Sequence, residues 1–279
     1  MGKQYTAEAV AARLRATVAE GRPVYVVGAG TGISAKMAEL GGADIVATYA
    51  MARYRMWGHS SMAGYLSICD NNQVTLEMGE REVIPAVREV PVVAGLLGVD
   101  PTRDMSRLLD RVREAGFSGI HNCPTVALID GTFRVALEET GLGFHKEVEM
   151  VRLAHERDLF TQVFVTTPEE AQEMVAAGAD LVIAHMGNSI GGTVGMRTSI
   201  SLDDAVGRVQ AIIDAVRASR SDGLVICHGG PIATPEDFAY VLQRTRGLVG
   251  FMGGSAAERF PVEQGIKAAT ERFKAVRLH

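Results

Sequence analysis

An eightfold repetition of one local pattern constrains the fold of this chain more than any other feature of its sequence. Eight short apolar runs rich in β-branched residues are each followed by a turn and then by a segment with helical periodicity. Nearly continuous apolar runs of this length are typical of parallel strands whose two faces are both buried. The eight runs cover residues 24–27, 44–47, 91–94, 117–120, 160–165, 180–184, 224–227 and 248–251.

The segments between these runs complete a strict strand–helix alternation. Helices are expected over residues 33–40, 72–87, 103–114, 133–157, 168–177, 202–219, 235–244 and 262–273. A further helix is expected within the first twenty residues, where Ala7, Val10, Ala11, Leu14 and Val18 form one apolar stripe. Eight consecutive units without an interrupting domain favour a closed barrel over an open sheet. The sequence therefore predicts one domain over residues 1–279, an α/β (β/α)8 (TIM) barrel with an extra N-terminal helix.

Composition and charge narrow the class of partner. The chain has 28 Lys+Arg against 33 Asp+Glu, a net charge of −5 without a basic cluster, which argues against nucleic acid. No apolar run reaches the roughly 18 residues of a membrane span, and the N-terminus lacks the apolar core of a signal peptide. Cys69, Cys123 and Cys227 are odd in number and far apart, which predicts free thiols. We therefore expect a cytoplasmic protein that binds neither membrane nor nucleic acid.

Glycine-rich turns follow three of the predicted strands, at the end of the barrel where such folds place their active sites. Gly28 and Gly30 follow the first strand, but with a Gly-x-Gly-x-Gly spacing, and Asp44 begins the next strand instead of ending it. These departures argue against dinucleotide binding. The turn either approaches a small anion or is only a tight connection.

The glycine pairs after the last two strands are stronger candidates for anion binding. Gly229-Gly230 and Gly253-Gly254, the latter followed by Ser255, can bring successive backbone N–H groups together on an oxyanion. We predict that they bind phosphate, phosphonate or carboxylate. The alternative is that these glycines serve turn geometry alone.

Four side chains near the strand ends could act on a substrate. His185 and His228 end adjacent strands and are candidate general acid and base groups, unless they are core residues with satisfied hydrogen bonds. Asn122 could polarise a carbonyl or orient water, or it could simply form a turn before Pro124. Glu258 could serve as a carboxylate base, or it could be a helix-surface charge paired with the neighbouring arginine.

Two long connections, 48–71 and 186–201, are expected to carry lid and substrate contacts. Arg53, Arg55 and Arg197 lie on them and could clamp a carboxylate, although each could equally be a solvated surface charge.

Other chemistries are not supported. None of the five lysines lies at a strand end, which argues against a Schiff base and against a pyridoxal-phosphate enzyme. The strand ends also lack a cluster of Asp and Glu that could hold Mg²⁺. We therefore predict no cofactor and no metal ligands. A transition metal on His185, His228 and Glu258 is the remaining metal alternative.

Five stretches together resemble one known family. They are Asn122-Cys-Pro-Thr-Val-Ala-Leu-Ile-Asp130-Gly, Glu147-Val-Glu149-Met-Val, Ala184-His185-Met-Gly, Cys227-His228-Gly-Gly-Pro-Ile-Ala and Gly253-Gly-Ser255-Ala-Ala-Glu258-Arg259-Phe-Pro. The chain resembles the phosphoenolpyruvate hydrolase-like (phosphonopyruvate hydrolase-like) TIM-barrel family, and it is similar to the C-terminal barrel of Tm-1-like proteins. The resemblance implies a homo-oligomeric barrel that acts on phosphoenolpyruvate- or phosphonopyruvate-like 2-oxo acids.

The sequence also departs from better known relatives. The acidic Mg²⁺ site and the Lys-x-Cys-Gly-His type loop of phosphonopyruvate and isocitrate-lyase enzymes are not found here. Ala50-Met51-Ala52 and Ser67-Ile68-Cys69 stand where smaller, more polar residues are expected in the second loop. The expected function is therefore a hydrolase or lyase that cleaves a C–C or C–P bond in a small anionic 2-oxo-acid-like substrate. The alternative is a non-catalytic metabolite-binding or regulatory barrel of the Tm-1-like kind.

Overall fold

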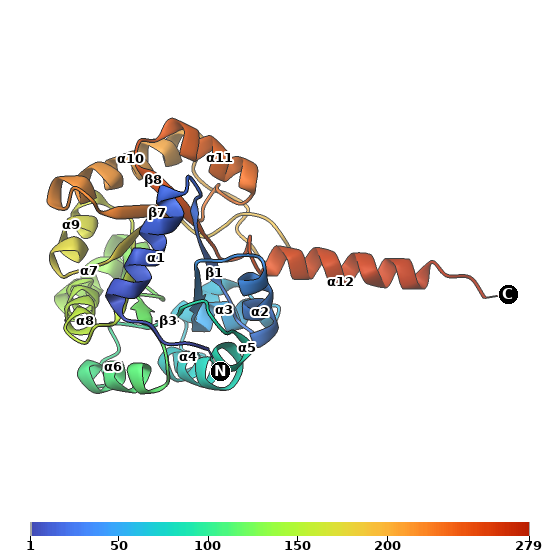
Figure 1. The fold of residues 1–279 in the computed structure, drawn as a ribbon, viewed down its shortest axis with the longest axis horizontal. Coiled ribbons are helices and arrows are strands. Elements are labelled where there is room, and N and C mark those ends of the chain that lie inside the picture. The colour runs from blue at the N-terminus through green and yellow to red at the C-terminus, as the bar shows by residue number, and fades with distance from the viewer. Residues whose placement is uncertain (1, 279) are drawn as a thin grey trace.

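Eight parallel strands close into a barrel in the computed structural model, which describes residues 2–278 (Figure 1). Closure occurs where β1 pairs with β8, with Val24 opposite Gly250 and Val26 opposite Met252. The predicted (β/α)8 barrel is therefore confirmed. The strands are β1 Val24–Gly28, β2 Ile45–Thr48, β3 Val92–Gly95, β4 Gly119–His121, β5 Phe160–Val165, β6 Leu181–His185, β7 Leu224–His228 and β8 Leu248–Gly253.

Helices follow the strands in the predicted order. They are α1 Ala7–Ala19, α2 Gly32–Leu40, α3 Ala50–Met56, α4 Asn71–Met78, α5 Ile84–Ala86, α6 Met105–Glu114, α7 Gly131–Glu139, α8 His145–His155, α9 Pro168–Ala176, α10 Leu202–Ser219, α11 Pro235–Arg244 and α12 Arg259–Lys274. Short 3-10 turns span Ser61–Tyr65 and Val126–Leu128. Within residues 2–278, no helix combines the length and apolar character that crossing a bilayer requires.

Two of the expected helices differ from the prediction. The single helix expected over residues 133–157 is two helices, α7 and α8, because Gly141 adopts a φ of 79° that ends the first of them. The helix expected over residues 72–87 is interrupted by a π-helical turn over Gly79–Val83, where Phe117 packs so closely that a Cβ atom on Gly79 would lie 2.0 Å from its ring. The alternation of strands and helices along the chain is unaffected by either difference.

Helix α1 closes the N-terminal end of the barrel. Its buried residues Val10 and Leu14 belong to the same apolar cluster as Val24, Phe160 and Leu181, which lie at the beginnings of β1, β5 and β6. Figure 1 shows α1 running across this end of the ring of strands. The extra N-terminal helix thus shuts the barrel floor, and the opposite end remains for the site.

The inward-facing positions of the strands can be read from the same cluster. In β5 they are Phe160, Gln162 and Phe164, and in β6 and β7 the series end on His185 and His228. Cys227 instead belongs to the second apolar cluster, which the strands form with the surrounding helices. Cys227 and His228 therefore point to opposite faces of β7, as neighbouring residues of a strand do.

Replacing Leu14 by alanine tests the role of α1 as the floor. Removal of this fully buried side chain is expected to lower the free energy of unfolding by roughly 2–5 kcal/mol, since a cavity would open under the barrel. Urea denaturation measures this change. Arg15→Ala on the same helix removes only an exposed ion pair with Asp222, so its effect should stay within about 0.5 kcal/mol. Equal effects of the two substitutions would contradict the role of α1.

Candidate active site

A small, partly open cavity of about 30 Å³ lies at the carboxyl ends of the strands. That volume accommodates a water molecule but no larger ligand. Ser61 and Tyr65 of the 48–71 connection and Asn188 of the 186–201 connection contribute to its wall. The two long connections therefore cover the strand ends, as expected. The lining residues are Tyr49, Met51, Arg55, Ser61, Tyr65, Cys123, Thr125, Leu128, Phe164, His185, Asn188 and His228.

His185 and His228 lie side by side in this cavity. The parallel register of β6 and β7 places the two residues directly opposite each other, with their ring centroids 4.7 Å apart. Phe164 of β5 contacts both rings, at centroid distances of 4.4 Å to His185 and 5.0 Å to His228. The structure thus brings the two predicted histidines together against an aromatic wall.

The hydrogen bonds of the two rings assign them opposite tautomers. Nδ1 of His185 accepts the Gly187 N–H at 3.0 Å, so the ring proton is on Nε2. Nδ1 of His228 lies 2.7 Å from the Met252 carbonyl oxygen and must donate to it, so Nε2 carries the lone pair. One ring therefore offers a donor and the other an acceptor.

Both rings are neutral at physiological pH. Burial lowers the pKa of His228 to about 4, and the nearby Arg55 acts in the same direction. Burial likewise holds the pKa of His185 well below its usual value, with smaller contributions from His228 and His121. Neutral rings are what the donor and acceptor assignment requires.

Arg55 supplies a buried positive charge at the same end of the barrel. Its Nη2 lies 3.3 Å from Oε2 of Glu258 and 3.4 Å from the Tyr49 hydroxyl, and its guanidinium lies 5.3 Å from the centroid of the Tyr49 ring. Its Nε has no hydrogen-bond acceptor among residues 2–278. These contacts are long for an arginine that is 5% exposed, so the guanidinium retains capacity to bind an anion.

Glu258 lies behind Arg55 and is almost completely buried. Its Oε1 accepts the Gly30 N–H at 2.6 Å, and its Oε2 faces Arg55. Burial raises the pKa of the Glu258 carboxyl, while Arg55 and the Gly30 N–H act in the opposite direction. Glu258 is therefore neither the surface charge paired with Arg259 nor directed at the cavity.

Gly254 lies where three of these groups meet. A Cβ atom at this position would lie 3.2 Å from Cε1 of His228, 3.4 Å from the Tyr49 hydroxyl and 3.7 Å from Nη1 of Arg55. A side chain at this point would occupy the space between the imidazole and the guanidinium. Glycine is thus needed for close approach.

The predicted glycine turns differ in what their backbones can bind. The Gly230 N–H donates to the Gly187 carbonyl at 2.7 Å and the Gly30 N–H to Glu258, so neither is available to a substrate. Gly28 admits the Tyr49 hydroxyl, which would lie 2.2 Å from a Cβ atom there. Gly28, Gly30 and Gly230 are therefore explained by packing and by internal hydrogen bonds.

The turn after β8 has backbone N–H groups that could bind an anion. Within residues 2–278, the N–H groups of Gly254 and Ser255 have no hydrogen-bond acceptor, and neither does that of Gly229. Ser255 also borders a second small hollow of about 20 Å³ together with Asn188 and Arg259. Gly253 packs against Tyr25 on the outside of the barrel, where a Cβ atom would lie 2.7 Å from the Tyr25 hydroxyl.

The side chain of Asn122 forms all its hydrogen bonds with other residues of the protein. Its Oδ1 accepts the Phe164 N–H at 2.6 Å, and its Nδ2 donates to Oε2 of Glu147 at 2.7 Å and to the Phe164 carbonyl at 3.0 Å. Every polar atom of Asn122 thus joins β4 to β5 and α8. The expectation that Asn122 polarises a substrate carbonyl has no support in this geometry.

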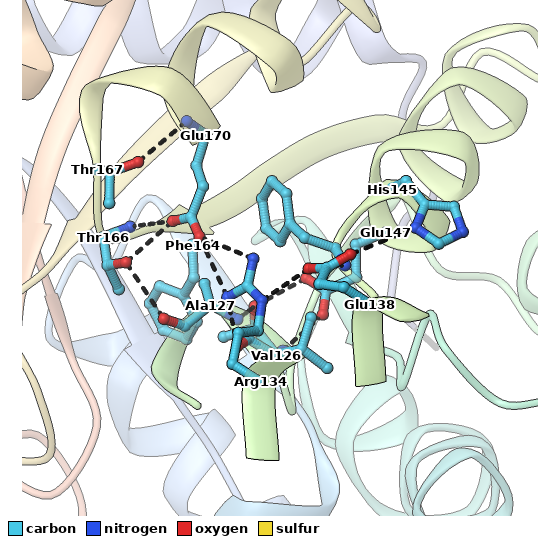
Figure 2. Close-up of polar contacts among 12 residues, drawn as sticks. Val126, Ala127, Arg134, Glu138, His145, Glu147, Phe164, Thr166, Thr167 and Glu170 are labelled. Carbon is cyan, nitrogen blue, oxygen red and sulfur yellow. Dashed lines mark hydrogen bonds and ion pairs between the residues drawn. The ribbon is translucent and has the colours of Figure 1, made fainter. Parts of the chain in front are cut away.

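Glu147 anchors this network from α8. It is fully buried, and burial raises its pKa to about 7 against the opposing effect of bonds from Val126, Thr125 and Asn122. Figure 2 shows Glu147 reaching Val126 and, beside it, Arg134 placed between Glu138 and Glu170. These carboxylates hold the β4 and β5 connections on the outer side of the strands.

The structure separates the arginines of the long connections. Arg53 points away from the cavity and forms an ion pair with Glu82, and Arg197 is exposed. Arg53 and Arg55 point in different directions because residues two positions apart on a helix do not share a face. Of the three candidate clamps, only Arg55 reaches the cavity.

Sequence reasoning missed four residues of the barrel interior. Tyr49 and Phe164 line the cavity, and the His121 ring packs edge-to-face against Phe164, with 4.2 Å between the ring centroids. Below them, His121 Nε2 and both side-chain polar atoms of Gln162 are buried without partners among the described residues. Continuing the inward alternation of each strand by one residue past its apolar run would have identified Tyr49 and His121.

A Mg²⁺ site of the carboxylate type does not fit these residues. Among residues 2–278, no three His, Cys, Asp or Glu side chains are grouped so that they could hold a metal ion. Glu258, which contacts the cavity-lining Arg55, is already bound by Arg55 and Gly30. The remaining carboxylates described above lie behind the strands.

A hydrolase and a lyase are among the solved structures that share this fold. A phosphonopyruvate hydrolase in complex with oxalate and Mg²⁺ superposes with a TM-score of 0.61 at 15% identity, covering 96% of this chain and 89% of that one. A 2,3-dimethylmalate lyase of the PEP mutase/isocitrate lyase superfamily gives 0.57 at 14% identity, covering 95% and 87%. At these identities the likeness shows a shared barrel fold.

Sequence relatives are closer. The ToMV susceptible protein tm-1(GCR26) of Solanum lycopersicum is 47% identical over 266 residues, 95% of this chain but 35% of that protein. A putative transcriptional regulatory protein, y4pA, of Sinorhizobium fredii is 37% identical over 270 residues, 96% of this chain and 44% of that protein. The chain thus spans less than half the length of these relatives. The family described as phosphoenolpyruvate hydrolase-like matches residues 9–276, and the chain therefore belongs to that family.

Proposed function

We propose that this barrel is a hydrolase or lyase that cleaves a C–C or C–P bond in a small anionic 2-oxo-acid-like substrate. The family membership and the hydrolases, mutases and lyases that share the fold support this class of chemistry. The observation that carries the proposal is the neutral pair His185 and His228, which presents one donor and one acceptor beside the buried Arg55. Such a set offers a proton donor, a proton acceptor and a positive charge to an anionic substrate.

The two histidines would act at different atoms of the substrate. Cleavage next to a carbonyl leaves the electrons of the broken bond in an enolate, whose oxygen the Nε2–H of His185 would stabilise. In hydrolysis, Nε2 of His228 would take a proton from the attacking water. In a lyase reaction, it would take a proton from a substrate hydroxyl, so that a second carbonyl forms as the bond breaks. An anionic substrate beside His228 would raise the pKa of this ring, since negative charge favours the imidazolium.

Arg55 would bind the anionic group of the substrate. Its contacts to Glu258 and Tyr49 are long enough to be supplemented by a carboxylate or phosphonate, and the free N–H groups of Gly254 and Ser255 lie on the adjacent turn. Glu258 would then position Arg55 and balance its charge, and would not serve as the base.

Substrate entry would require the two covering connections to separate. The cavity holds about 30 Å³, and Asn188 donates from its Nδ2 to the Met62 sulfur at 2.9 Å across the two connections. A 2-oxo acid is several times larger than a water molecule. Opening at this contact would admit it, and closing would exclude bulk water from an enolate.

The proposal requires both histidines to remain neutral over the working pH range. His228 is expected to titrate only near pH 4, with its proton on Nδ1 above that pH, whereas His185 keeps its proton on Nε2. Because these folded-state pKa values lie below the roughly 6.5 of an unfolded chain, the rings contribute stability above pH 6.5 that is lost as pH falls toward 4. Nitrogen-15 NMR of the imidazoles during a pH titration measures both properties, with His228→Asn to assign the signals. Titration of either ring near pH 6.5 would contradict the assignment.

Substitution of each histidine tests the catalytic roles. His185→Gln and His228→Asn should each lower turnover of a 2-oxo-acid substrate by about 100-fold or more, the usual contribution of a general acid or base. His145→Gln is the matched control, because His145 is an exposed residue of α8. Turnover within about threefold of the parent for both variants would exclude the roles. Tight calorimetric binding without product in the parent protein would favour a metabolite-binding regulatory barrel instead.

A pair of arginines on one helix tests the anion site. Arg55→Met combined with Glu258→Gln, which avoids leaving a buried carboxylate alone, should weaken binding of oxalate by about 10- to 100-fold. Arg53→Met should leave the dissociation constant within about twofold, since Arg53 faces Glu82. Isothermal titration calorimetry measures both. A stronger effect at Arg53 than at Arg55 would overturn the assignment.

A further inference from the structure

A groove much larger than the candidate active-site cavity lies next to that cavity, on the β3 and β4 side of the barrel. It has a volume of about 380 Å³ and lies between the 48–71 connection and α7, and we call it the α7 groove. Clefts that bind small molecules are mostly apolar and typically hold about 300–1,000 Å³. The large apolar residues that line the α7 groove are Leu66, Leu97, Val99, Ile129, Phe133 and Leu137.

Exposed apolar side chains border the α7 groove on both sides. Leu66 of the 48–71 connection is 62% exposed, and Phe133 of α7 is 63% exposed. Large apolar side chains exposed around one concave surface mark a binding surface. Met51 and Cys69, which lie in stretches where smaller and more polar residues are expected, line the cavity and the groove respectively. The apolar character of this connection therefore belongs to both hollows.

Tyr65 and Thr125 separate the α7 groove from the cavity, since both residues line both hollows. The Tyr65 hydroxyl donates to the Thr125 carbonyl at 2.9 Å. Tyr65 lies on the same 3-10 turn as Met62, which Asn188 contacts across the two covering connections. Opening at the Asn188 contact would therefore move Tyr65 as well, and one hydrogen bond would be lost between the two hollows.

The order of the strands directs a bound substrate toward the α7 groove. β4 and β8 lie opposite each other in the closed ring of eight strands. The free N–H groups of Gly254 and Ser255 follow β8, and Arg55 contacts Glu258 beside them. Thr125 follows β4, on the far side of the histidine pair. A substrate whose anionic group is bound by Arg55 therefore has its other end directed toward Tyr65 and the groove.

The charges around the α7 groove determine what kind of group can enter it. Among the described residues, its lining includes the carboxylates of Asp70 and Asp100 and no Lys or Arg. Arg103 forms ion pairs with both of these carboxylates. A second carboxylate or phosphate would meet no unpaired positive charge here, whereas an aliphatic chain would bury apolar surface against Leu97 and Ile129. The α7 groove therefore suits a neutral apolar group.

We propose that the α7 groove binds an aliphatic chain of the substrate whose anionic group is bound by Arg55. The inference rests on the proposed function and narrows its substrate to a 2-oxo-acid-like anion that carries an extended apolar substituent. Tyr65 moves aside to admit the chain, and its ring then forms part of the wall along which the chain passes from the cavity to the groove.

Straight-chain 2-oxo acids of increasing length test the inference in the parent protein. Pyruvate presents the carboxylate and the carbonyl with a single methyl group, and 2-oxooctanoate extends that end with a chain of methylene groups. Each methylene group that reaches the groove should tighten binding by about two- to fourfold, because it is removed from water. Isothermal titration calorimetry should therefore give 2-oxooctanoate a dissociation constant about 30-fold or more below that of pyruvate. Equal dissociation constants would overturn the inference.

Two matched pairs of exposed residues locate the chain. Phe133→Asp alters the α7 groove, whereas Val135→Asp alters an exposed residue of the same helix that is not part of its lining. Phe133→Asp should weaken binding of 2-oxooctanoate by about tenfold and leave that of pyruvate within about twofold. Val135→Asp should change neither. Leu66→Asp and its control Ile68→Asp form the second pair, in the 48–71 connection.

Circular dichroism verifies that each of these variants is folded. An equal loss of 2-oxooctanoate binding in Phe133→Asp and Val135→Asp would overturn the inference, since the chain would then not lie in the α7 groove.

The double variant Arg55→Met, Glu258→Gln distinguishes failure of this inference from failure of the proposed function. It should weaken binding of pyruvate and 2-oxooctanoate by the same factor, because both acids share the anionic group. Unchanged binding of 2-oxooctanoate would overturn the inference, since the groove would then bind apolar chains independently of Arg55. Binding of oxalate and pyruvate without a preference for longer chains would overturn the inference alone. Failure of every acid to bind would overturn the proposed function as well.

Discussion

The parallel register of β6 and β7 is the constraint on which the candidate site depends. It sets His185 opposite His228, while the backbone next to each ring determines which atoms that ring can reach. His185 is followed by a turn whose Gly187 N–H bends back to its Nδ1, whereas His228 faces the carbonyl of Met252 on β8. Two residues of the same type thereby become a donor and an acceptor. The difference arises from the backbone around them and not from the side chains.

Close backbone approach has a second consequence at this end of the barrel. Gly28 admits the Tyr49 hydroxyl and Gly254 leaves the space between His228 and Arg55 open, so aromatic, basic and imidazole groups meet in a cavity of about 30 Å³. A buried guanidinium is costly unless it is paired, and Glu258 provides the compensating charge. The glycines therefore act mainly by making room for side chains, although the N–H groups of Gly229, Gly254 and Ser255 have no hydrogen-bond acceptor among residues 2–278.

The sequence predicted the alternation well because strand burial and helical periodicity are local properties. All eight strands and the N-terminal helix were found within a few residues. The expected helix over residues 133–157 failed at Gly141, since a single glycine is compatible with a helix and its left-handed conformation depends on the surrounding packing. The pairing of the two histidines could also be predicted from the sequence, because the carboxyl ends of neighbouring strands in a barrel lie close together.

The directions of individual side chains could not be predicted from local sequence patterns. Arg53 and Arg55 differ by two positions on one short helix, yet one faces Glu82 and the other the cavity. Asn122 directly follows β4, but its hydrogen bonds to Phe164 and Glu147 direct its side chain between β4 and β5 and not toward the cavity. The hydrogen-bond partners of Asn122 lie 25 and 42 residues away along the chain. The ion-pair partner of Arg53 lies 29 residues away. A single sequence contains no local signal for such pairings.

The two ends of the last βα unit are linked through Glu258. This residue closes the turn after β8, holds Arg55 toward the cavity and borders a surface groove of about 380 Å³ beside α2, one residue before α12 begins. Its carboxyl group is buried in the barrel, and its neighbour Arg259 fastens α12 to the connection that covers the site. Displacement of α12 would therefore move the backbone of Glu258 and strain the connection over residues 186–201 at once. The position of α12 is therefore linked to the position of Arg55 through a single residue, Glu258.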